Sequence, residues 1–264
     1  MKEQFQHKVT TSFFMWFDNF LLTKGEAFSN KTGEFSYYED ARLDSTYKAY
    51  GSPFKTWVTD SSITGASIPT GVFINGNFSG RDDGVVLDFE NGRALISGSD
   101  EDLTVTGEFS VKDFNVYITN DTEDDLIVEN KYKVNSRLPS ASYGAISPYD
   151  AFGGIQNTSV QVKAVILAED TYQLDGVLSI FMDSVNECIT SIPMTGYPIT
   201  ELGDLKDGSY SYTGSEAGYT DNRKFYVDSV TTSKLTDRDR KSLAHEMYVG
   251  FIDFDIKQMR LRFT

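Results

Sequence analysis

The feature that most constrains this chain is the alternation of apolar and polar residues with a period of two. In Leu103–Phe109 the odd positions are mostly apolar and the even positions are polar. This is the pattern of a β-strand that buries one of its faces. The same alternation is found in several other segments: Phe114–Ile118, Val160–Ile166, Leu174–Met182 around Gly176, Tyr248–Ile256 and Met259–Phe263. We therefore predict that strands fill most of the chain.

Two Asn-Gly dipeptides stand between apolar runs. Asn75-Gly76 follows Val72–Ile74, and Asn91-Gly92 lies between Val85–Phe89 and Ala94–Ile96. Asn and Gly tolerate the two positive φ angles of a type I′ turn, whose twist matches that of the strands it joins. Both dipeptides are therefore predicted to be hairpin turns.

Helical signals are sparse. Thr236 could cap a helix over Asp237–Met247, and Ser12 could cap a short helix. The apolar residues on one side of that short helix would be Phe13, Trp16, Phe17 and Phe20. The predicted fold class is all-β, with antiparallel sheets in a sandwich or barrel-like arrangement, hairpins, long loops and one or two short helices.

Ser, Gly and Pro are concentrated in residues 136–158, which predicts a long loop or a boundary between two β units. We expect a β domain over residues 1–135, including an apolar N-terminal segment, and a second β unit over residues 159–264; one continuous domain is the alternative. A second loop-like stretch, Pro193–Asn222, is rich in Gly and Tyr and could form an extended arm.

The chain carries 39 acidic and 24 basic residues, for a formal net charge of -15. Such a surface repels nucleic-acid phosphates and anionic lipids, so neither nucleic acid nor a membrane is an expected partner. The apolar run Phe13–Phe17 is interrupted by Asp18 and is far shorter than the roughly 20 residues of a membrane helix. Cys188 is the single cysteine, which excludes an internal disulfide.

No catalytic or metal site can be assembled from the sequence. The two histidines, His7 and His245, are far apart, and neither a nucleophile elbow nor a phosphate-binding loop is present. One Cys and two His do not suffice for zinc, and the calcium-like start Asn75–Gly80 has Val86 where the bidentate Glu should stand. We expect no catalytic residue, no metal and no cofactor, and hence not an enzyme.

Two alternatives remain open at this point. Trp57 with nearby tyrosines could form the stacking surface of a carbohydrate-binding β-sandwich, a receptor-binding module. A pair of carboxylates could serve a glycoside hydrolase if the two met across a cleft. The acidic clusters that could supply such a pair are Asp82-Asp83, Asp100-Glu101-Asp102, Glu123-Asp124-Asp125 and Asp204 with Asp207.

The segment Val85–Tyr117 contains an aspartate-bearing strand, an Asn-Gly-Arg turn, a second strand and then a strand of the form Val-x-Gly-x-Phe. In this it resembles β-hairpin units of the neck and tail proteins of tailed bacteriophages. Tyr248–Asp255 and Asp18–Leu22 are similar in character. The resemblance implies a virion structural protein made in the host cytoplasm: a head-to-tail connector, collar or tail-end component.

The same resemblance implies a ring of identical copies that also contacts other virion proteins of the neck or tail. The candidate interface residues are Phe13, Phe14, Trp16, Phe17, Tyr210, Tyr212, Phe251, Phe254 and Phe263.

Overall fold

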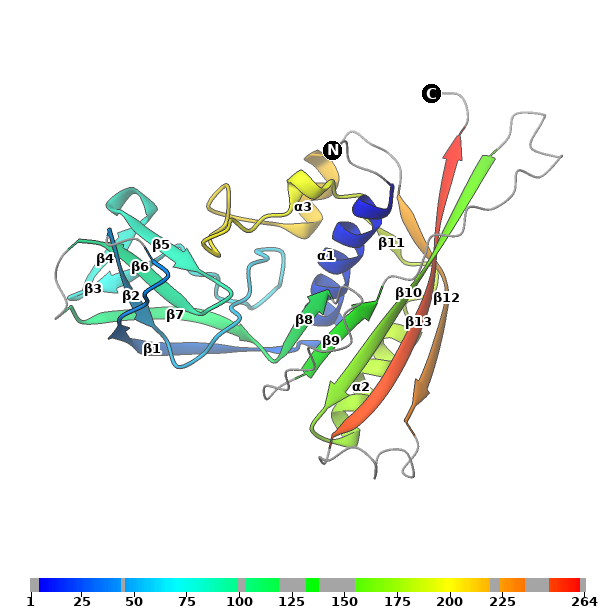
Figure 1. The fold of residues 1–264 in the computed structure, drawn as a ribbon, viewed down its shortest axis with the longest axis horizontal. Helices are drawn as coiled ribbons and strands as arrows, with labels where there is room; N and C mark the ends of the chain where they lie inside the picture. The colour runs from blue at the N-terminus through cyan, green and yellow to red at the C-terminus, as the bar shows by residue number, and fades with distance from the viewer. Residues whose placement is uncertain are drawn as a thin grey trace. The chain divides into compact units, whose positions relative to one another are not determined.

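The computed structural model describes residues 5–43, 46–98, 103–118, 132–137, 155–218, 224–235 and 247–261. The chain forms two compact units, each built from discontinuous segments (Figure 1). The first, the helix–sheet unit, comprises residues 1–26, 114–197 and 215–264; the second, the barrel unit, comprises residues 27–113 and 198–214.

This division differs from the one expected at residues 136–158. The strands on either side of that stretch, β9 (Tyr132–Arg137) and β10 (Ile155–Ala168), pair with each other in one sheet. The chain instead passes between units near Glu26, Asp113, Tyr197 and Gly214. Local composition marks loops, whereas membership of a unit depends on strand pairing between distant segments.

The barrel unit is a seven-stranded sheet in the order β4-β3-β7-β1-β2-β6-β5. The outer strand β5 also lies beside β3 and β4, so the sheet curls into a barrel-like form. Its strands are β1 (Phe28–Tyr38), β2 (Tyr47–Gly51), β3 (Gly71–Ile74), β4 (Asn77–Gly80), β5 (Val85–Asp88), β6 (Arg93–Ser97) and β7 (Val105–Lys112), with a 3-10 turn, η1 (Arg81–Asp83), between β4 and β5.

Aromatic side chains fill the core of the barrel. Trp57 is 1% exposed and stacks on Phe109 with their ring centroids 4.7 Å apart. Phe35 and Phe89 pack against Trp57 at 5.6 and 6.0 Å. The alternation in β7 faces this core, since Val105, Phe109 and Val111 are buried whereas Glu108 is exposed. Burying such large rings is the main favourable contribution to folding of this unit.

The two predicted turns differ in the structure. Asn75 and Gly76 both have positive φ angles, 50° and 84°, and join Ile74 directly to Asn77 in a two-residue turn. In the β5–β6 hairpin the loop instead has four residues, from Phe89 to Gly92, because Asp88 pairs with Arg93. Gly92 has a positive φ of 64° but Asn91 does not, so the predicted type I′ turn at Asn91-Gly92 is wrong.

The helix–sheet unit contains a six-stranded sheet in the order β11-β12-β13-β10-β9-β8. Its pairs are antiparallel except for β8 with β9. β10 and β13 form its longest ladder, with Ile155 opposite Leu261 and Ala168 opposite Tyr248. The remaining strands are β8 (Phe114–Ile118), β11 (Cys188–Ile189), β12 (Phe225–Lys234) and β13 (Tyr248–Leu261).

Two helices cover one face of this sheet. α2 (Thr171–Met182) packs on β10, β12 and β13, and α1 (Phe5–Gly25) packs on α2 and contacts β8 and β11. Phe17 of α1 stacks on Phe181 of α2 with ring centroids 4.1 Å apart. The unit also contains a 3-10 turn, η3 (Met194–Gly196), and most of a short helix, α3 (Tyr212–Gly218). The strand-dominated fold class predicted from the sequence is confirmed.

The helices themselves were predicted incorrectly. Leu174–Met182 was expected to be a strand, but its buried residues Leu174, Val177, Leu178 and Phe181 follow helical spacing, and Asp170 caps the helix by accepting from Gln173 N–H at 2.7 Å. In so short an apolar run, the same residues fit both the two-residue period of a strand and the 3.6-residue period of a helix.

The N-terminal helix is also longer than expected. α1 has 21 residues and begins at Phe5, so Ser12 lies inside the helix rather than at its cap. The Ser12 hydroxyl accepts from Ile192 N–H at 2.8 Å and donates to Ile192 O at 3.3 Å. The helix predicted at Asp237–Met247 lies almost wholly outside the described residues. No helix in the described ranges combines the length and apolar character needed to cross a membrane.

Candidate functional site

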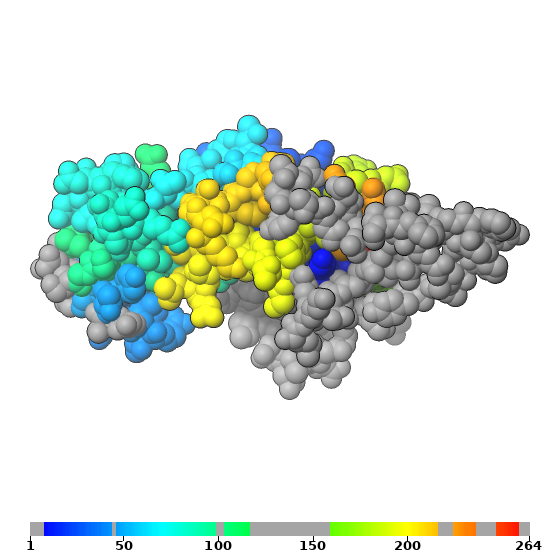
Figure 2. Space-filling view, turned by 90° about the horizontal axis from the view of Figure 1, so that it is seen from above, coloured from blue at the N-terminus to red at the C-terminus, as the bar shows by residue number. Residues whose placement is uncertain are grey.

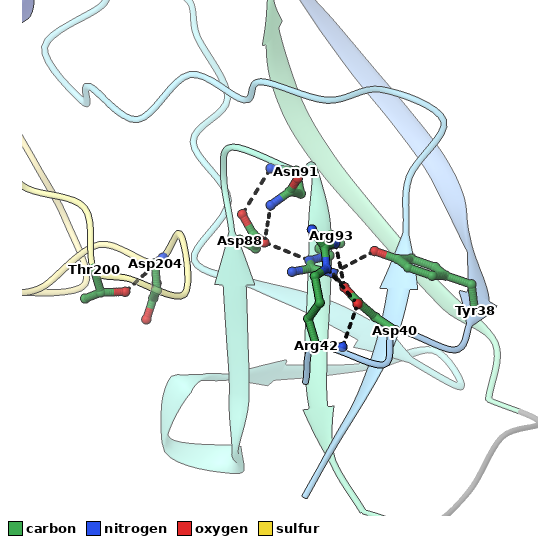
Figure 3. Close-up of polar contacts among 8 residues, drawn as sticks. All are labelled: Tyr38, Asp40, Arg42, Asp88, Asn91, Arg93, Thr200 and Asp204. Carbon is green, nitrogen blue, oxygen red and sulfur yellow. Dashed lines mark hydrogen bonds and ion pairs between the residues drawn. The ribbon is translucent and has the colours of Figure 1, made fainter. Parts of the chain in front are cut away.

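The most developed polar cluster in the described structure lies in the barrel unit and is centred on Arg93, the first residue of β6 (Figure 3). Arg93 donates from Nε to Asp88 Oδ2 at 2.7 Å and from Nη1 to Asp40 Oδ2 at 2.6 Å. A further bond at 2.9 Å joins Nη1 to the hydroxyl of Tyr38. The three partners come from β5, from the end of β1 and from the segment that follows it, so one guanidinium ties together three parts of the chain.

The local sequence explains why these groups meet. Asp88 ends β5 and Arg93 begins β6 as its paired residue, so the two side chains are neighbours where the strands meet the hairpin loop. Asn91 completes the arrangement by donating its backbone N–H to Asp88 Oδ1 at 3.0 Å and its amide to Oδ2 at 2.8 Å. Gly92 is required because a Cβ there would overlap the carbonyl oxygen of Phe54.

Asp40 is shared between two arginines. Besides Arg93, it accepts hydrogen bonds from Arg42 Nε and Nη2, both at 2.9 Å, and from the Arg42 backbone N–H at 3.0 Å. The side chain of Arg42 is 80% exposed, whereas those of Arg93 and Asp40 are 8% and 6% exposed. The cluster therefore has a buried half, Arg93 with Asp88, and an exposed rim at Arg42.

The ionisation of these groups follows from their partners. Hydrogen bonds from Arg42 and then from Arg93 hold the pKa of Asp40 well below its usual value. Burial alone would lower the pKa of Arg93, but its bonds to Asp40, Tyr38 and Asp88 outweigh burial and raise it. Both groups thus stay charged near neutral pH. Such a pair holds chain segments together and is poorly suited to exchanging protons.

A segment distant in sequence is fixed beside this cluster. Residues 198–214, here called the return segment, belong to the barrel unit and lie directly against its cyan residues in the space-filling view (Figure 2). Gly203 O accepts from Phe89 N–H at 3.0 Å. Gly203 has a φ of 84°, and a Cβ there would overlap the Asp88 carboxylate. Only a residue without a side chain permits this approach.

Two further contacts fasten the return segment. Arg81 Nη2 binds Asp204 Oδ2 at 2.9 Å, while burial raises the pKa of Asp204 against the opposing effect of Arg81. Asp60 Oδ1 accepts from Tyr212 N–H at 3.0 Å, and Ser61 N–H donates to Tyr210 O at 2.8 Å. The return segment is therefore an integral layer of the barrel unit.

Six of the eight candidate interface residues that the structure describes are buried. Phe13, Trp16, Phe17 and Phe254 are at most 2% exposed and form one aromatic cluster with Phe181 (ring contacts of 4.1 to 6.2 Å). This corrects the expectation that these four residues present a contact surface, because their rings pack against one another inside the helix–sheet unit.

The other candidates have mixed environments. Tyr210 and Tyr212 are 8% and 6% exposed, so the expected tyrosine arm is docked rather than extended. Phe14 is half-buried with its ring 6.2 Å from that of Tyr197. Phe251 is half-buried beneath Lys163, whose Nζ is 5.1 Å from the ring centroid. Phe263 lies outside the described residues.

Trp57, Asp82 and Asp83, described candidates for sugar binding or hydrolysis, have structural positions in the barrel unit. Trp57 is enclosed in the barrel core and offers no stacking face to a sugar. Asp82 and Asp83 lie in η1, where Asp83 accepts from Gly80 N–H at 3.0 Å. The clusters at residues 100–102 and 123–125 fall outside the described ranges. Among described residues, no group of three or more His, Cys, Asp and Glu could hold a metal ion.

The Arg93 cluster was not predicted, although the amino-acid sequence contains part of the pattern that forms it. An Asp five positions before an Arg, on either side of an Asn-Gly dipeptide, places opposite charges at the two ends of one hairpin loop. Asp40 and Gly203 carried no such local signal, since their approach depends on the tertiary fold. Comparisons with protein-family models, with curated proteins and with solved structures found no match to this chain.

Proposed function

We propose that this chain is a structural component of a tailed-bacteriophage virion, in the neck or tail, and that it acts through a ring of its own copies and through contacts with neighbouring virion proteins. The observation that carries the proposal is the construction of the β5–β6 hairpin, which lies in the segment resembling neck and tail proteins. Its aspartate and arginine form a buried ion pair, and Asn91 in the loop between them adds two hydrogen bonds to the aspartate.

This cluster is suited to a mechanical role. Asp88 is bound by Arg93 and by two donors of Asn91, and Asp40 is bound by two arginines, so each carboxylate already has its partners. Networks of this kind specify a unique arrangement of segments and resist local opening. Such rigidity would suit a protein that transmits load between its neighbours.

The helix–sheet unit supports the same role. The β10–β13 ladder pairs 14 residues of each strand, which is long for a globular domain. Pairs of opposite charge link neighbouring strands of the sheet: Lys163 of β10 with Asp253 of β13 at 3.8 Å, and Lys257 of β13 with Asp228 of β12 at 2.6 Å. A long ladder backed by two helices is a stiff element on which interfaces between subunits can be placed.

The carbohydrate-binding alternative lacks a comparable observation. Its stacking residue, Trp57, is buried. The exposed aromatic pair Phe73 and Phe78 meets edge to face at 72°, which does not make the flat platform on which a sugar ring stacks.

The proposal is tested by measuring whether the purified protein assembles and whether it is present in virions. Purified full-length protein is studied by mass photometry and negative-stain imaging, alone and with the products of adjacent virion genes, and virions are studied by mass spectrometry. A closed ring or a defined complex, together with the chain in purified particles, is expected. Absence from particles combined with a monomer in the presence of those partners would refute the proposal.

A further inference from the structure

The two Asn-Gly dipeptides of the barrel unit have different hydrogen-bond partners. Asn75-Gly76 forms the two-residue turn between β3 and β4, and Asn91-Gly92 ends the four-residue loop between β5 and β6. Both asparagines are exposed to solvent. An asparagine followed by glycine is prone to react with its own backbone, because glycine has no Cβ to hinder the approach of its nitrogen. The partners of each asparagine therefore decide whether it reacts.

The reaction is deamidation through a cyclic imide. At Asn75, the backbone nitrogen of Gly76 loses its proton to a base from solvent and attacks Cγ, and Oδ1 takes up the negative charge. The bond from Cγ to Nδ2 then breaks, and Nδ2 takes a proton from water and leaves as ammonia. Water opens the five-membered ring at either carbonyl carbon, which gives aspartate or isoaspartate. One amide and one water thus become a carboxylate and an ammonium ion, without an oxidant or a cofactor.

The partners of Asn75 favour this reaction. Thr104 N–H donates to Asn75 Oδ1 at 3.0 Å. Because negative charge develops on Oδ1, the same hydrogen bond stabilises the tetrahedral intermediate. Within the described structure, neither Nδ2 of Asn75 nor the N–H of Gly76 donates to an acceptor. The leaving group and the attacking nitrogen therefore lose no protein hydrogen bond when they react.

The β3–β4 hairpin also permits the rotation that the attack requires. The backbone N–H of Asn75 donates to Thr104 O at 2.8 Å, so the asparagine stays beside Thr104 while rotation about its Cα–C bond brings Gly76 N toward Cγ. The two strands that the turn joins have four residues each. The end of so short a hairpin opens locally at low free energy.

The partners of Asn91 oppose the same reaction. Its leaving group, Nδ2, donates to Asp88 Oδ2 at 2.8 Å, and its backbone N–H donates to Asp88 Oδ1 at 3.0 Å. These bonds to a carboxylate are lost if the amide leaves, and the negative charge of Asp88 disfavours a second negative charge on Asn91. Gly92 is also held in place, because Gly92 O accepts from Ser52 N–H at 2.9 Å and a Cβ at Gly92 would overlap Phe54.

We propose that Asn75 is a site of spontaneous deamidation and that Asp88 protects Asn91 from it. The product adds one negative charge to the β3–β4 hairpin. Where the product is isoaspartate, the backbone of the turn gains one carbon atom, which no longer fits a two-residue connection between paired strands. Formation of this product is expected to loosen the pairing of β3 with β4. The proposal goes beyond the virion role and does not rest on it.

The test follows both sites in one sample of the full-length protein. The protein is incubated at mildly alkaline pH, with and without denaturing urea, and is then digested with trypsin at mildly acidic pH, which slows further deamidation. Trypsin cleaves after Lys55, Arg81 and Arg93, so the two sites fall in separate peptides, 56–81 and 82–93. Mass spectrometry measures the conversion of amide to carboxylate, and fragmentation distinguishes Asn75 from Asn77. Digested Asn75→Asp protein supplies the standard that separates aspartate from isoaspartate.

In the folded protein we expect Asn75 to convert at least about tenfold faster than Asn91, since the activated state at Asn91 loses bonds that Asn75 does not have. In urea the two rates should become similar, because both sites are then Asn-Gly in an unfolded chain. An Asn75 that keeps its amide overturns the proposal, and so do equal rates at the two sites in the folded protein. A difference that persists unchanged in urea also overturns it, because the neighbouring sequence and not the folded structure would then be the cause.

Discussion

The guanidinium of Arg93 binds the carboxylate of Asp88 at the loop end of the β5–β6 hairpin, with Nε 2.7 Å from Oδ2 and with 8% and 1% of the two side chains exposed. Asp40, bound to the same guanidinium, precedes Arg93 by 53 residues, and the two are joined across 2.6 Å. The cluster thus links a local hairpin to the end of β1, and its removal should affect the whole barrel unit.

Replacing Arg93 by Ala should destabilise the protein strongly. The change leaves Asp88 buried without its cation, and breaking one side of a buried pair costs about 3–5 kcal/mol. Arg42→Ala is the matched control, because Arg42 also binds Asp40 but is 80% exposed, and solvent screening makes exposed pairs contribute much less than buried ones. Urea unfolding of both variants measures the difference. Equal decreases in the free energy of unfolding would contradict the account that the buried Arg93–Asp88 pair stabilises the protein more than the exposed Arg42–Asp40 pair.

Gly203→Ala should destabilise the docking of the return segment. A Cβ at Gly203 would overlap the Asp88 carboxylate, and the residue has a φ of 84°. Gly65→Ala is the control, since Gly65 has a φ of 85° and a Cβ added there would have no atom within 4 Å. The control should lose about 1–2 kcal/mol from backbone strain alone. Hydrogen exchange of Phe89 N–H should quicken in the first variant and not in the second.

Stability should fall in acid through Asp40. Its pKa is lowered from 3.8 in the folded protein by Arg42 and Arg93, so the unfolded state binds the proton more readily. The stabilisation is present above the unfolded value of 3.8 and is lost as the pH falls below it toward the folded pKa.

The Asp40→Asn variant should therefore show a shallower loss of unfolding free energy over that acid range. Tyr38→Phe keeps the carboxylate and should retain the wild-type slope. Denaturant unfolding as a function of pH compares the three proteins. If the slope of Asp40→Asn matched the wild-type slope, the ion pairs of Asp40 would not account for the acid sensitivity.

Gly250→Ala should disturb the packing of α2 on β13. A Cβ at Gly250 would lie 2.8 Å from Leu174 Cδ1 and 3.3 Å from Leu178. Overpacking of this kind costs about 1–3 kcal/mol. In a Leu174→Ala background the added methyl enters vacated space, so the same substitution should become neutral or stabilising. Additive effects in thermal unfolding of the single and double variants would contradict this account.

Asp170→Ala should weaken α2. Asp170 Oδ1 accepts from Gln173 N–H at 2.7 Å, and loss of an N-cap costs about 1 kcal/mol. Asp170→Asn retains an acceptor oxygen and should lose less. Circular dichroism during urea unfolding reports both variants. A loss for Asn as large as that for Ala would indicate that the charge, and not the cap hydrogen bond, is responsible.

The amino-acid sequence by itself determined the strand-rich class and the elements whose pattern is unambiguous. β7 alternates over enough residues to define its buried face, and Asn75-Gly76 has the φ angles that these residue types favour. Such features depend on neighbours in the chain, and their signal is therefore local. α2 was missed because the spacing of Leu174, Leu178 and Met182 fits both periods.

The tertiary structure alone decided which residues meet. Asp40 reaches Arg93, and Gly203 reaches Asp88, because strands and segments far apart in sequence pack into one barrel. Likewise, Phe13 and Phe17 looked like an exposed apolar run, yet they are buried against Phe181 and Phe254. Burial and ion pairing depend on the positions of distant groups, and a pattern of neighbouring residues does not contain those positions.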